Sequence, residues 1–264
     1  VWDDDYNVTA NAALRDAAGL GRIWTQVTVA PWYPLYHTVF WVGYQLWGLD
    51  ALGYHLLNVL LHGLNAILVW RILWRLELHW AWFAAALFAL HPVQVESVAW
   101  ITELKNVLST TFYLAAMSCY LSYAGWQRSS GSSPAAGRAY GFALFLFACA
   151  LLTKTVTVTL PLALLLLVWW KRGRIGRGDV LPLLPLFGLG LVLGLVTALT
   201  EKYVVGASGF AWSHDLIERG LIAGRAFWFY AGKLLWPDPI LFVYPRWTID
   251  RGLPGAYIYP AAVA

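Results

Sequence analysis

The sequence has few charged residues: Asp, Glu, Lys and Arg together make up 12% of its 264 residues. Soluble globular domains contain about 25% charged residues, so this deficit argues against a soluble fold. The net charge of +4 is small and gives no indication of nucleic-acid binding. Hydrophobic residues make up 60% of the chain, and its 17 tryptophans are typical of the aromatic belts at membrane interfaces. The composition therefore predicts an all-α, polytopic bundle of transmembrane helices.

Cysteine is also scarce, and the two cysteines, Cys119 and Cys149, both lie within apolar stretches. This context predicts packed free thiols rather than a disulfide. The sequence shows no internal repeat and no signal-peptide pattern; it begins at Val1 and stops within the apolar run 257–264. We therefore expect one membrane domain over residues 1–264 that is a fragment, with membrane helices missing at both ends.

Six apolar runs separated by short polar joints follow the first 51 residues. Several approach the ~20 residues that cross a bilayer, and two short runs are expected to recruit flanking residues. We predict an external loop at 1–51, transmembrane helices at 52–199, and an external or interfacial segment at 200–264 that includes the start of a further helix. The six runs are 52–75, 80–101, 105–124, 139–152, 156–170 and 180–199.

Basic residues concentrate on alternate joints, and this pattern predicts the orientation of the chain. The joints at 71–79, 126–138 and 171–179 are richer in arginine than those between them, so the positive-inside rule puts them in the cytoplasm. The aromatic stretch 34–49 is predicted to be a helix lying on the outer leaflet, because a crossing there would reverse this parity. By parity, four segments face the exterior: 1–51, 91–105, 153–155 and 200 onward.

Three adjacent carboxylates, Asp3, Asp4 and Asp5, stand on the external side near the start of the chain. Crowded carboxylates repel one another, and each prefers water or a cation, so the cluster indicates a functional role. Catalysis is the first candidate for that role.

Lys154 lies between two apolar helices, on the same external side as the three acids. One interpretation is a lysine that extends to the lipid headgroups. The other, which we favour, is a point charge for a lipid-linked phosphate, with Thr153 and Thr155 as additional donors.

Other polar residues on the external side have open roles. His91, Glu96 and Glu103 stand in the joint at 91–105, where the glutamates either bind a cation, orient an acceptor or cap helices. Lys105, which follows Glu103, is a further candidate for contact with a donor phosphate.

The stretch 213–236 either crosses the membrane or lies on its surface, and the sequence leaves both open. Arg225 is its best candidate for binding a donor phosphate, and the alternative is that it anchors an interfacial helix.

Four polar residues, His55, Asn58, His62 and Asn65, are spaced by three, four and three positions, which puts them on one face of a helix. Metal binding is one interpretation of this row. Hydrogen bonding between packed membrane helices explains it as well, and we favour that second interpretation.

Three motifs follow one another along the chain in an order that resembles membrane glycosyltransferases of the GT-C fold. The resemblance is strongest to the bacterial relatives of the transmembrane and tetratricopeptide-repeat O-mannosyltransferases, and the Lys154 joint and Tyr244-Pro245-Arg246-Trp247 are also similar to that group. The motifs are Asp3-Asp4 followed by Asn11, then Tyr54-His55-x-x-Asn58-x-x-x-His62, then His91-Pro92-Val93-x-x-Glu96.

This resemblance implies an integral protein of a bacterial inner membrane, with a polyprenyl-phosphate sugar as donor, a protein Ser or Thr hydroxyl as acceptor, and an active site facing the periplasm. It implies that Asp3 or Asp4 is the general base of an inverting transfer, with Asp4 slightly preferred. It also implies that the first helix and a C-terminal repeat domain of the family lie outside this chain. Asn106 stands where several members carry another acid, so we expect no cofactor and no required metal.

Two other functions remain as alternatives. A transporter or flippase for a lipid-linked substrate would carry mid-membrane charges and paired half-repeats, and the sequence has its charges at helix ends and no repeat. A non-catalytic membrane subunit that only retains the fold is the second alternative.

Overall fold

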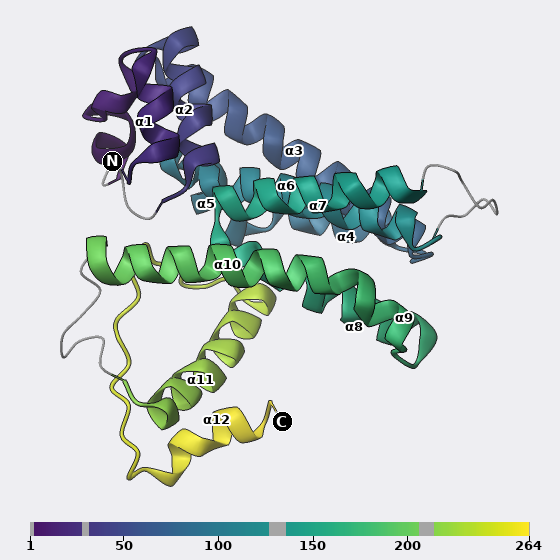
Figure 1. The fold of residues 1–264 in the computed structure, drawn as a ribbon. Helices are drawn as coiled ribbons and strands as arrows, with labels where there is room; N and C mark the ends of the chain where they lie inside the picture. Colours follow the sequence, from purple (N-terminus) through teal and green to yellow (C-terminus); the bar gives the residue numbers. More distant parts are fainter. Residues whose placement is uncertain (1–2, 28–31, 127–135, 206–213, 264) are drawn as a thin grey trace.

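The computed structural model describes residues 3–27, 32–126, 136–205 and 214–263, and this part of the chain is helical without a β-strand (Figure 1). The all-α prediction is thus confirmed. The described helices are α1 (Ala18–Thr25), α2 (Pro34–Trp47), α3 (Ala51–Arg75), α4 (Ala81–Leu90), α5 (Val95–Ala99), α6 (Leu104–Tyr123), α7 (Ala136–Thr153), α8 (Leu160–Arg172), α9 (Arg177–Val180), α10 (Leu184–Thr200), α11 (Leu216–Leu235) and α12 (Ile258–Ala261).

Four helical stretches in the described residues are long and apolar enough to cross a membrane. They are Ala51–Arg75, Ala136–Thr153, Thr155–Arg172 and Arg177–Val204. The short apolar runs recruit flanking residues, as expected: α8 is preceded by the helical turn Thr155–Thr159, which brings that stretch to 18 residues. Both cysteines are free thiols, also as expected.

The apolar run 80–101 does not form one long helix, and it breaks where the joint predicted at 91–105 begins. Helix α4 ends at Leu90, because Pro92 lacks a backbone N–H and its ring clashes with the preceding turn of a helix. The imidazole Nδ1 of His91 instead accepts a hydrogen bond from the Val93 N–H at 3.2 Å, and a short turn leads into α5. The 91–105 joint is therefore folded back on the end of the bundle.

Helix α6 matches the run 105–124 but is not among the four most apolar stretches. It packs between α3 and α7, so its polar residues face other helices rather than lipid. The Asn65 side-chain amide donates to the Val107 carbonyl at 2.8 Å, and the Thr111 hydroxyl donates to Asn65 Oδ1 at 2.8 Å. Polar contacts of this kind hold membrane helices together.

Two buried clusters organise the described helices. One joins α3, α6, α7, α8 and α10, with Ala116, Phe147 and Leu164 nearly inaccessible to solvent. The other joins the first loop, α1 and α2 to the adjoining ends of α3 and α6 through Leu14 and Phe40. Helix α2 corresponds to the helix expected at 34–49, and it ends at Gly48, whose φ of 58° favours glycine. The first loop is thus fixed on one end of the bundle.

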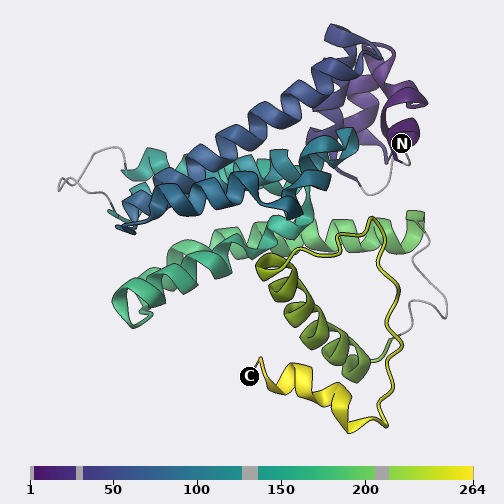
Figure 2. The same ribbon diagram turned by 180° about the vertical axis from the view of Figure 1, so that it is seen from behind.

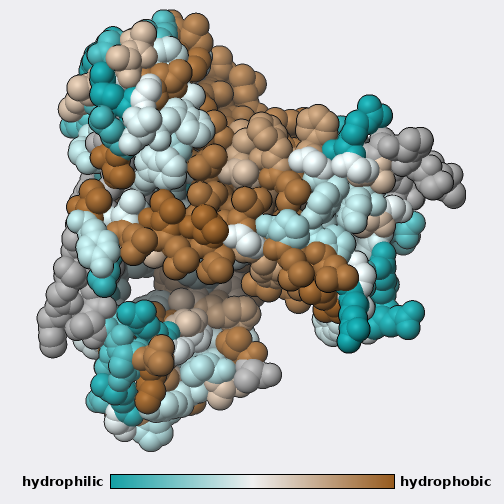
Figure 3. All heavy atoms as spheres, viewed as in Figure 1, coloured by the Kyte–Doolittle hydropathy of each residue, from teal (hydrophilic) through white to brown (hydrophobic). Residues whose placement is uncertain are grey.

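The basic joints at 71–79 and 171–179 lie together at the opposite end of the bundle (Figure 1, right). Lys171 Nζ donates to the Leu76 carbonyl, and the Arg172 guanidinium lies 5.5 Å from the ring centroid of Trp126. Figure 3 shows hydrophilic residues gathered at this end and apolar residues along the bundle. These two joints share one end of the bundle, as charge alternation predicts; most of the joint 126–138, including Arg128, lies outside the described residues.

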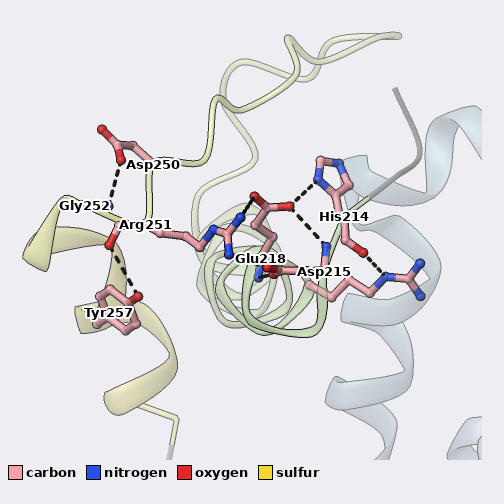
Figure 4. Close-up of polar contacts among 8 residues, drawn as sticks. His214, Asp215, Glu218, Asp250, Arg251, Gly252 and Tyr257 are labelled. Carbon is pink, nitrogen blue, oxygen red and sulfur yellow. Dashed lines mark hydrogen bonds and ion pairs between the residues drawn. The ribbon is translucent and has the colours of Figure 1, made fainter. Parts of the chain in front are cut away.

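The segment 214–263 forms an arm that extends away from the bundle (Figures 1 and 2). Asp215 caps α11 by accepting the Glu218 N–H at 2.8 Å, and Arg251 binds the carboxylates of both residues (Figure 4). The arm meets the bundle where the His91 Nε2 lies 2.9 Å from the Leu234 carbonyl oxygen. Helix α11 is not one of the four stretches apolar enough to span a membrane.

Candidate active site

The scaffold of the candidate site is residues 100–106, which comprise the turn after α5 and the first three residues of α6 and are called the site turn. A short 3-10 helix, Ile101–Glu103, leads directly into α6. The Tyr36 hydroxyl donates to the Thr102 carbonyl at 3.0 Å, and the Asn58 side-chain amide donates to the Trp100 carbonyl at 3.0 Å. Both partners are buried, so α2 and α3 hold this turn in place.

Asp4 is the one of the three adjacent acids that binds this turn. Its Oδ1 accepts from the Trp100 indole N–H at 3.0 Å and from the Thr102 backbone N–H at 3.3 Å. The backbone carbonyl of Asp3 accepts from Asn7 at 3.0 Å, and the carboxylate of Asp5 accepts from a neighbouring threonine of its own helical turn. The structure thus places Asp4 against the site scaffold.

Asp4 also lines a cavity of about 690 Å³ between the first loop, α3, α5 and the arm. A second carboxylate, Glu96, lines it as well, and the remaining walls are largely apolar. The Phe242 ring lies 5.0 Å from the Trp100 ring, centroid to centroid, so the arm closes one side of the cavity. Pockets with apolar walls and a few polar groups are the usual form of a small-molecule site.

Lys154 also contacts this turn, through Asn106 at its α6 end. Its Nζ donates to Oδ1 of Asn106, the residue at the start of α6. The Asn106 amide nitrogen in turn donates to Glu103 Oε2 at 2.5 Å, and Lys105 Nζ lies 2.8 Å from Glu103 Oε1. Asp4 and Lys154 are therefore both bound to one turn, although Lys154 does not line the cavity that contains Asp4.

The threonines beside Lys154 make internal contacts. The Thr153 hydroxyl donates to the Cys149 carbonyl at 2.8 Å, and the Thr155 hydroxyl lies 2.6 Å from that of Thr197. These contacts give no support to the expectation that both hydroxyls bind a phosphate.

Burial and neighbouring charges shift the pKa values of groups around the turn. Burial lowers the pKa of Lys154, and the carboxylate of Glu103 opposes that shift. Burial, reinforced by Lys105, lowers the pKa of His37 from 6.5 to about 4, so this imidazole is neutral at pH 7. Burial raises the pKa of Tyr36 well above its usual value, so its hydroxyl stays a donor. Charged groups at the site end of the bundle are thus partly removed from water.

Arg225 and His91 lie apart from this cluster. The Arg225 guanidinium stacks 4.7 Å from the Trp247 ring centroid and lines a separate cavity of about 350 Å³ within the arm. His91 lines a pocket of about 400 Å³ beside α3 and binds the arm through Leu234. Arg225, predicted to bind a donor phosphate as Lys154 and Lys105 are, therefore lies apart from both in the structure, and its role stays a prediction.

The row of polar residues on α3 mostly joins helices. Asn58, His62 and Asn65 are buried and bind backbone carbonyls of Trp100, Ala89 and Val107, whereas His55 lines the cavity beside Asp4. Among the described residues, no three His, Cys, Asp or Glu side chains gather as metal ligands would. The expectation that no metal is required stays a prediction.

Sequence reasoning missed the partners that orient the two charged groups. Trp100 and Thr102 hold Asp4, and Phe242 reaches the cavity from about 140 positions farther along the chain. The neutral residue Asn106 holds Lys154. Only Asn106 was singled out from the sequence, as a departure from the pattern of the enzymes that the chain resembles.

The fold and the site together define an all-helical membrane protein with a carboxylate-containing cavity at one end of its bundle. Parts of the chain are similar to protein O-mannosyl-transferases. It is 36% identical over 89 residues to one from Caenorhabditis elegans, which is 32% of this chain and 13% of that protein. It is 34% identical over 92 residues to protein O-mannosyl-transferase TMTC2 of Mus musculus, 34% of this chain and 11% of that protein.

A longer match, 33% identical over 135 residues, covers 47% of this chain and 15% of protein O-mannosyl-transferase Tmtc1 of Drosophila melanogaster. Parts of the chain are thus similar to proteins of this family. The matched segments cover only a small share of each relative's length. No protein-family model matches the chain. No solved structure matches it either.

Proposed function

We propose that this chain is the membrane part of a glycosyltransferase that moves a sugar, mannose by analogy with its relatives, onto a protein hydroxyl. The donor is a polyprenyl-phosphate sugar. The observation that carries the proposal is that the Asp4 carboxylate and the Lys154 ammonium bind the same turn at one end of an apolar bundle. The names of the partial relatives support the reaction class.

In this mechanism Asp4 is the general base. The acceptor hydroxyl oxygen attacks the anomeric carbon, its proton passes to the Asp4 carboxylate, and the bond from that carbon to the phosphate oxygen breaks. A single displacement of this kind inverts the anomeric centre. Lys154 stabilises the charge that grows on the departing lipid phosphate.

The basic joints at 71–79 and 171–179 support a cytoplasmic position for their end of the bundle. The Asp4 end then faces the exterior, which in a bacterium is the periplasmic side of the inner membrane. In this proposal the cavity beside Trp100 and Phe242 receives the acceptor hydroxyl.

The substitution Asp4→Asn tests the base. Asn keeps an oxygen that accepts from Trp100 and Thr102, so insertion and folding are retained while proton acceptance is lost. We expect sugar transfer from polyprenyl-phosphate mannose to fall by about 10²- to 10⁴-fold. Asp5→Asn is the matched control, because Asp5 binds only within its own turn, and it should leave transfer near the wild-type rate. Unchanged transfer in the Asp4→Asn protein would overturn Asp4 as the base, and unchanged transfer in the Asp3→Asn protein as well would overturn the reaction.

A further inference from the structure

Lys154 is held by a neutral partner whose orientation is determined by its neighbours. The lysine only donates hydrogen bonds, so Asn106 must turn its Oδ1 toward it. A carboxylate only accepts, so the Asn106 amide nitrogen must face Glu103, at 2.5 Å, and it also lies 3.0 Å from the Ser97 hydroxyl. The amide has one orientation that satisfies all three contacts.

The acid of this network is already engaged on both oxygens. Glu103 binds Lys105 through Oε1 and the Asn106 amide through Oε2. Among the described residues, no carboxylate lies within ion-pair distance of Lys154, whose side chain is half-buried. A half-buried ammonium without an ion pair is costly in a protein, and a bound anion would offset that cost.

We propose that Asn106 is a positioning residue that holds the Lys154 ammonium at the donor phosphate site without neutralising it. This inference rests on the proposed function, because it assigns to Asn106 the orientation of the lysine that binds the donor. An acid at this position would form an ion pair with Lys154 and neutralise the positive charge that binds the phosphate. It would also place a second carboxylate beside Glu103.

The test is a comparison of phosphate and alcohol binding by the full chain in detergent or nanodiscs. The probes are a short-chain polyprenyl phosphate and the corresponding polyprenol, which lacks the anion. We expect the wild type to prefer the phosphate by about tenfold or more, and Asn106→Asp to lose about tenfold of that preference with polyprenol binding unchanged. In a Lys154→Met background, Asn106→Asp should have no further effect, because two residues that act through one contact are not additive.

The outcomes separate this inference from the proposed function. If Lys154→Met leaves the phosphate preference intact, the phosphate role of Lys154 is wrong and the inference is wrong with it. If Lys154→Met removes the preference but Asn106→Asp does not, only the inference is overturned. A loss that is equal for phosphate and polyprenol would also overturn it, since that result describes a fold defect.

A second variant covers the case in which Asn106→Asp fails to fold. Asn106→Ser is neutral and too short to reach Lys154, and we expect it to lower the phosphate preference by about three- to tenfold. A wild-type preference in folded Asn106→Ser protein would contradict the proposal. Gel filtration and circular dichroism establish folding for every variant.

Discussion

Lys154 and Lys171 stand at opposite ends of the same apolar stretch, and their surroundings differ in kind. Lys171 is exposed at the end of α8, where its Nζ donates to the Leu76 carbonyl and lies 5.1 Å from the Trp170 ring centroid. Lys154 is half-buried and binds a side-chain amide in a network of further charges. Cations near exposed helix C-termini are ordinary, whereas charge enclosed by packed helices needs another reason.

The ion pairs at the two ends show the same contrast. Arg172 and Asp179, at the basic end, lie 2.6 Å apart with side chains 44% and 19% exposed. Lys105 and Glu103, at the site end, lie 2.8 Å apart with side chains 21% and 11% exposed. The membrane topology alone therefore explains the charges at the basic end. The charges at the site end are less exposed to water, and the topology does not require them.

The largest expected difference between the ends is in catalysis. Lys154→Met should lower the kcat/KM for polyprenyl-phosphate mannose by about 10²- to 10³-fold, because it removes the charge that stabilises the leaving phosphate. Lys171→Met is the same substitution at the other end and should leave transfer near wild type. Equal effects of the two variants in a transfer assay would erase the functional contrast between the ends.

Acid should destabilise the site end through His37. Its pKa is about 4 in the folded protein against 6.5 in the unfolded chain, so stability is complete above pH 6.5 and is lost as the pH falls toward 4. The expected loss is about 3 kcal/mol in the free energy of unfolding, because only the unfolded chain takes up the proton in that window.

Unfolding measurements from pH 7 to pH 4 check this expectation in matched variants. His37→Phe should flatten the pH dependence, while His79→Phe, at an exposed position of the basic end, should leave it as in wild type. A slope that His37→Phe does not change would assign the acid sensitivity to other groups.

The ion pairs should differ in stability. Glu103→Gln leaves one side-chain acceptor where Lys105 and Asn106 each need one, and we expect a loss of about 2 kcal/mol in the free energy of unfolding. Asp179→Asn breaks the more exposed pair and should cost less than about 1 kcal/mol. Chemical denaturation in detergent measures both, and a larger loss for Asp179→Asn would reverse the comparison.

The smallest expected effect concerns close packing beside Lys154. A Cβ at Gly190 would lie 2.6 Å from Val158 Cγ2, in the turn that follows Lys154, so Gly190→Ala should cost about 1 kcal/mol. Gly178, at the basic end, has no neighbour within 4 Å of such an atom, and Gly178→Ala should be neutral or slightly stabilising. Thermal unfolding of the two variants checks whether the site end is the more tightly packed one.

Much of the fold was predictable because it depends on local patterns. Apolar runs of membrane length became α3, α7, α8 and α10, and alternation of basic joints correctly grouped one end of the bundle. The run 80–101 breaks at His91-Pro92, at the start of the predicted joint, because proline's missing N–H outweighs the hydrophobicity of its neighbours.

The site was predictable only in part. The sequence pointed to Asp4 and Lys154, and the structure binds both to one turn. Arg225, predicted to bind a donor phosphate, stacks on Trp247 within the arm, apart from Asp4 and Lys154, and its phosphate role stays a prediction. Charge type and sidedness are readable from sequence, whereas the separation of two residues about 70 positions apart is not.

The sequence by itself determined the helical membrane class, the shared end of the joints 71–79 and 171–179 and the residues able to carry charge, since these follow from composition and short-range periodicity. Only the tertiary structure decided that Asp4 rather than its neighbours binds the site turn, and that Asn106 rather than an acid holds Lys154. Hydrogen bonds between residues 48 to 98 positions apart depend on how α2, α3, α6 and α7 pack. That packing is a property of the whole bundle, and no local pattern contains it.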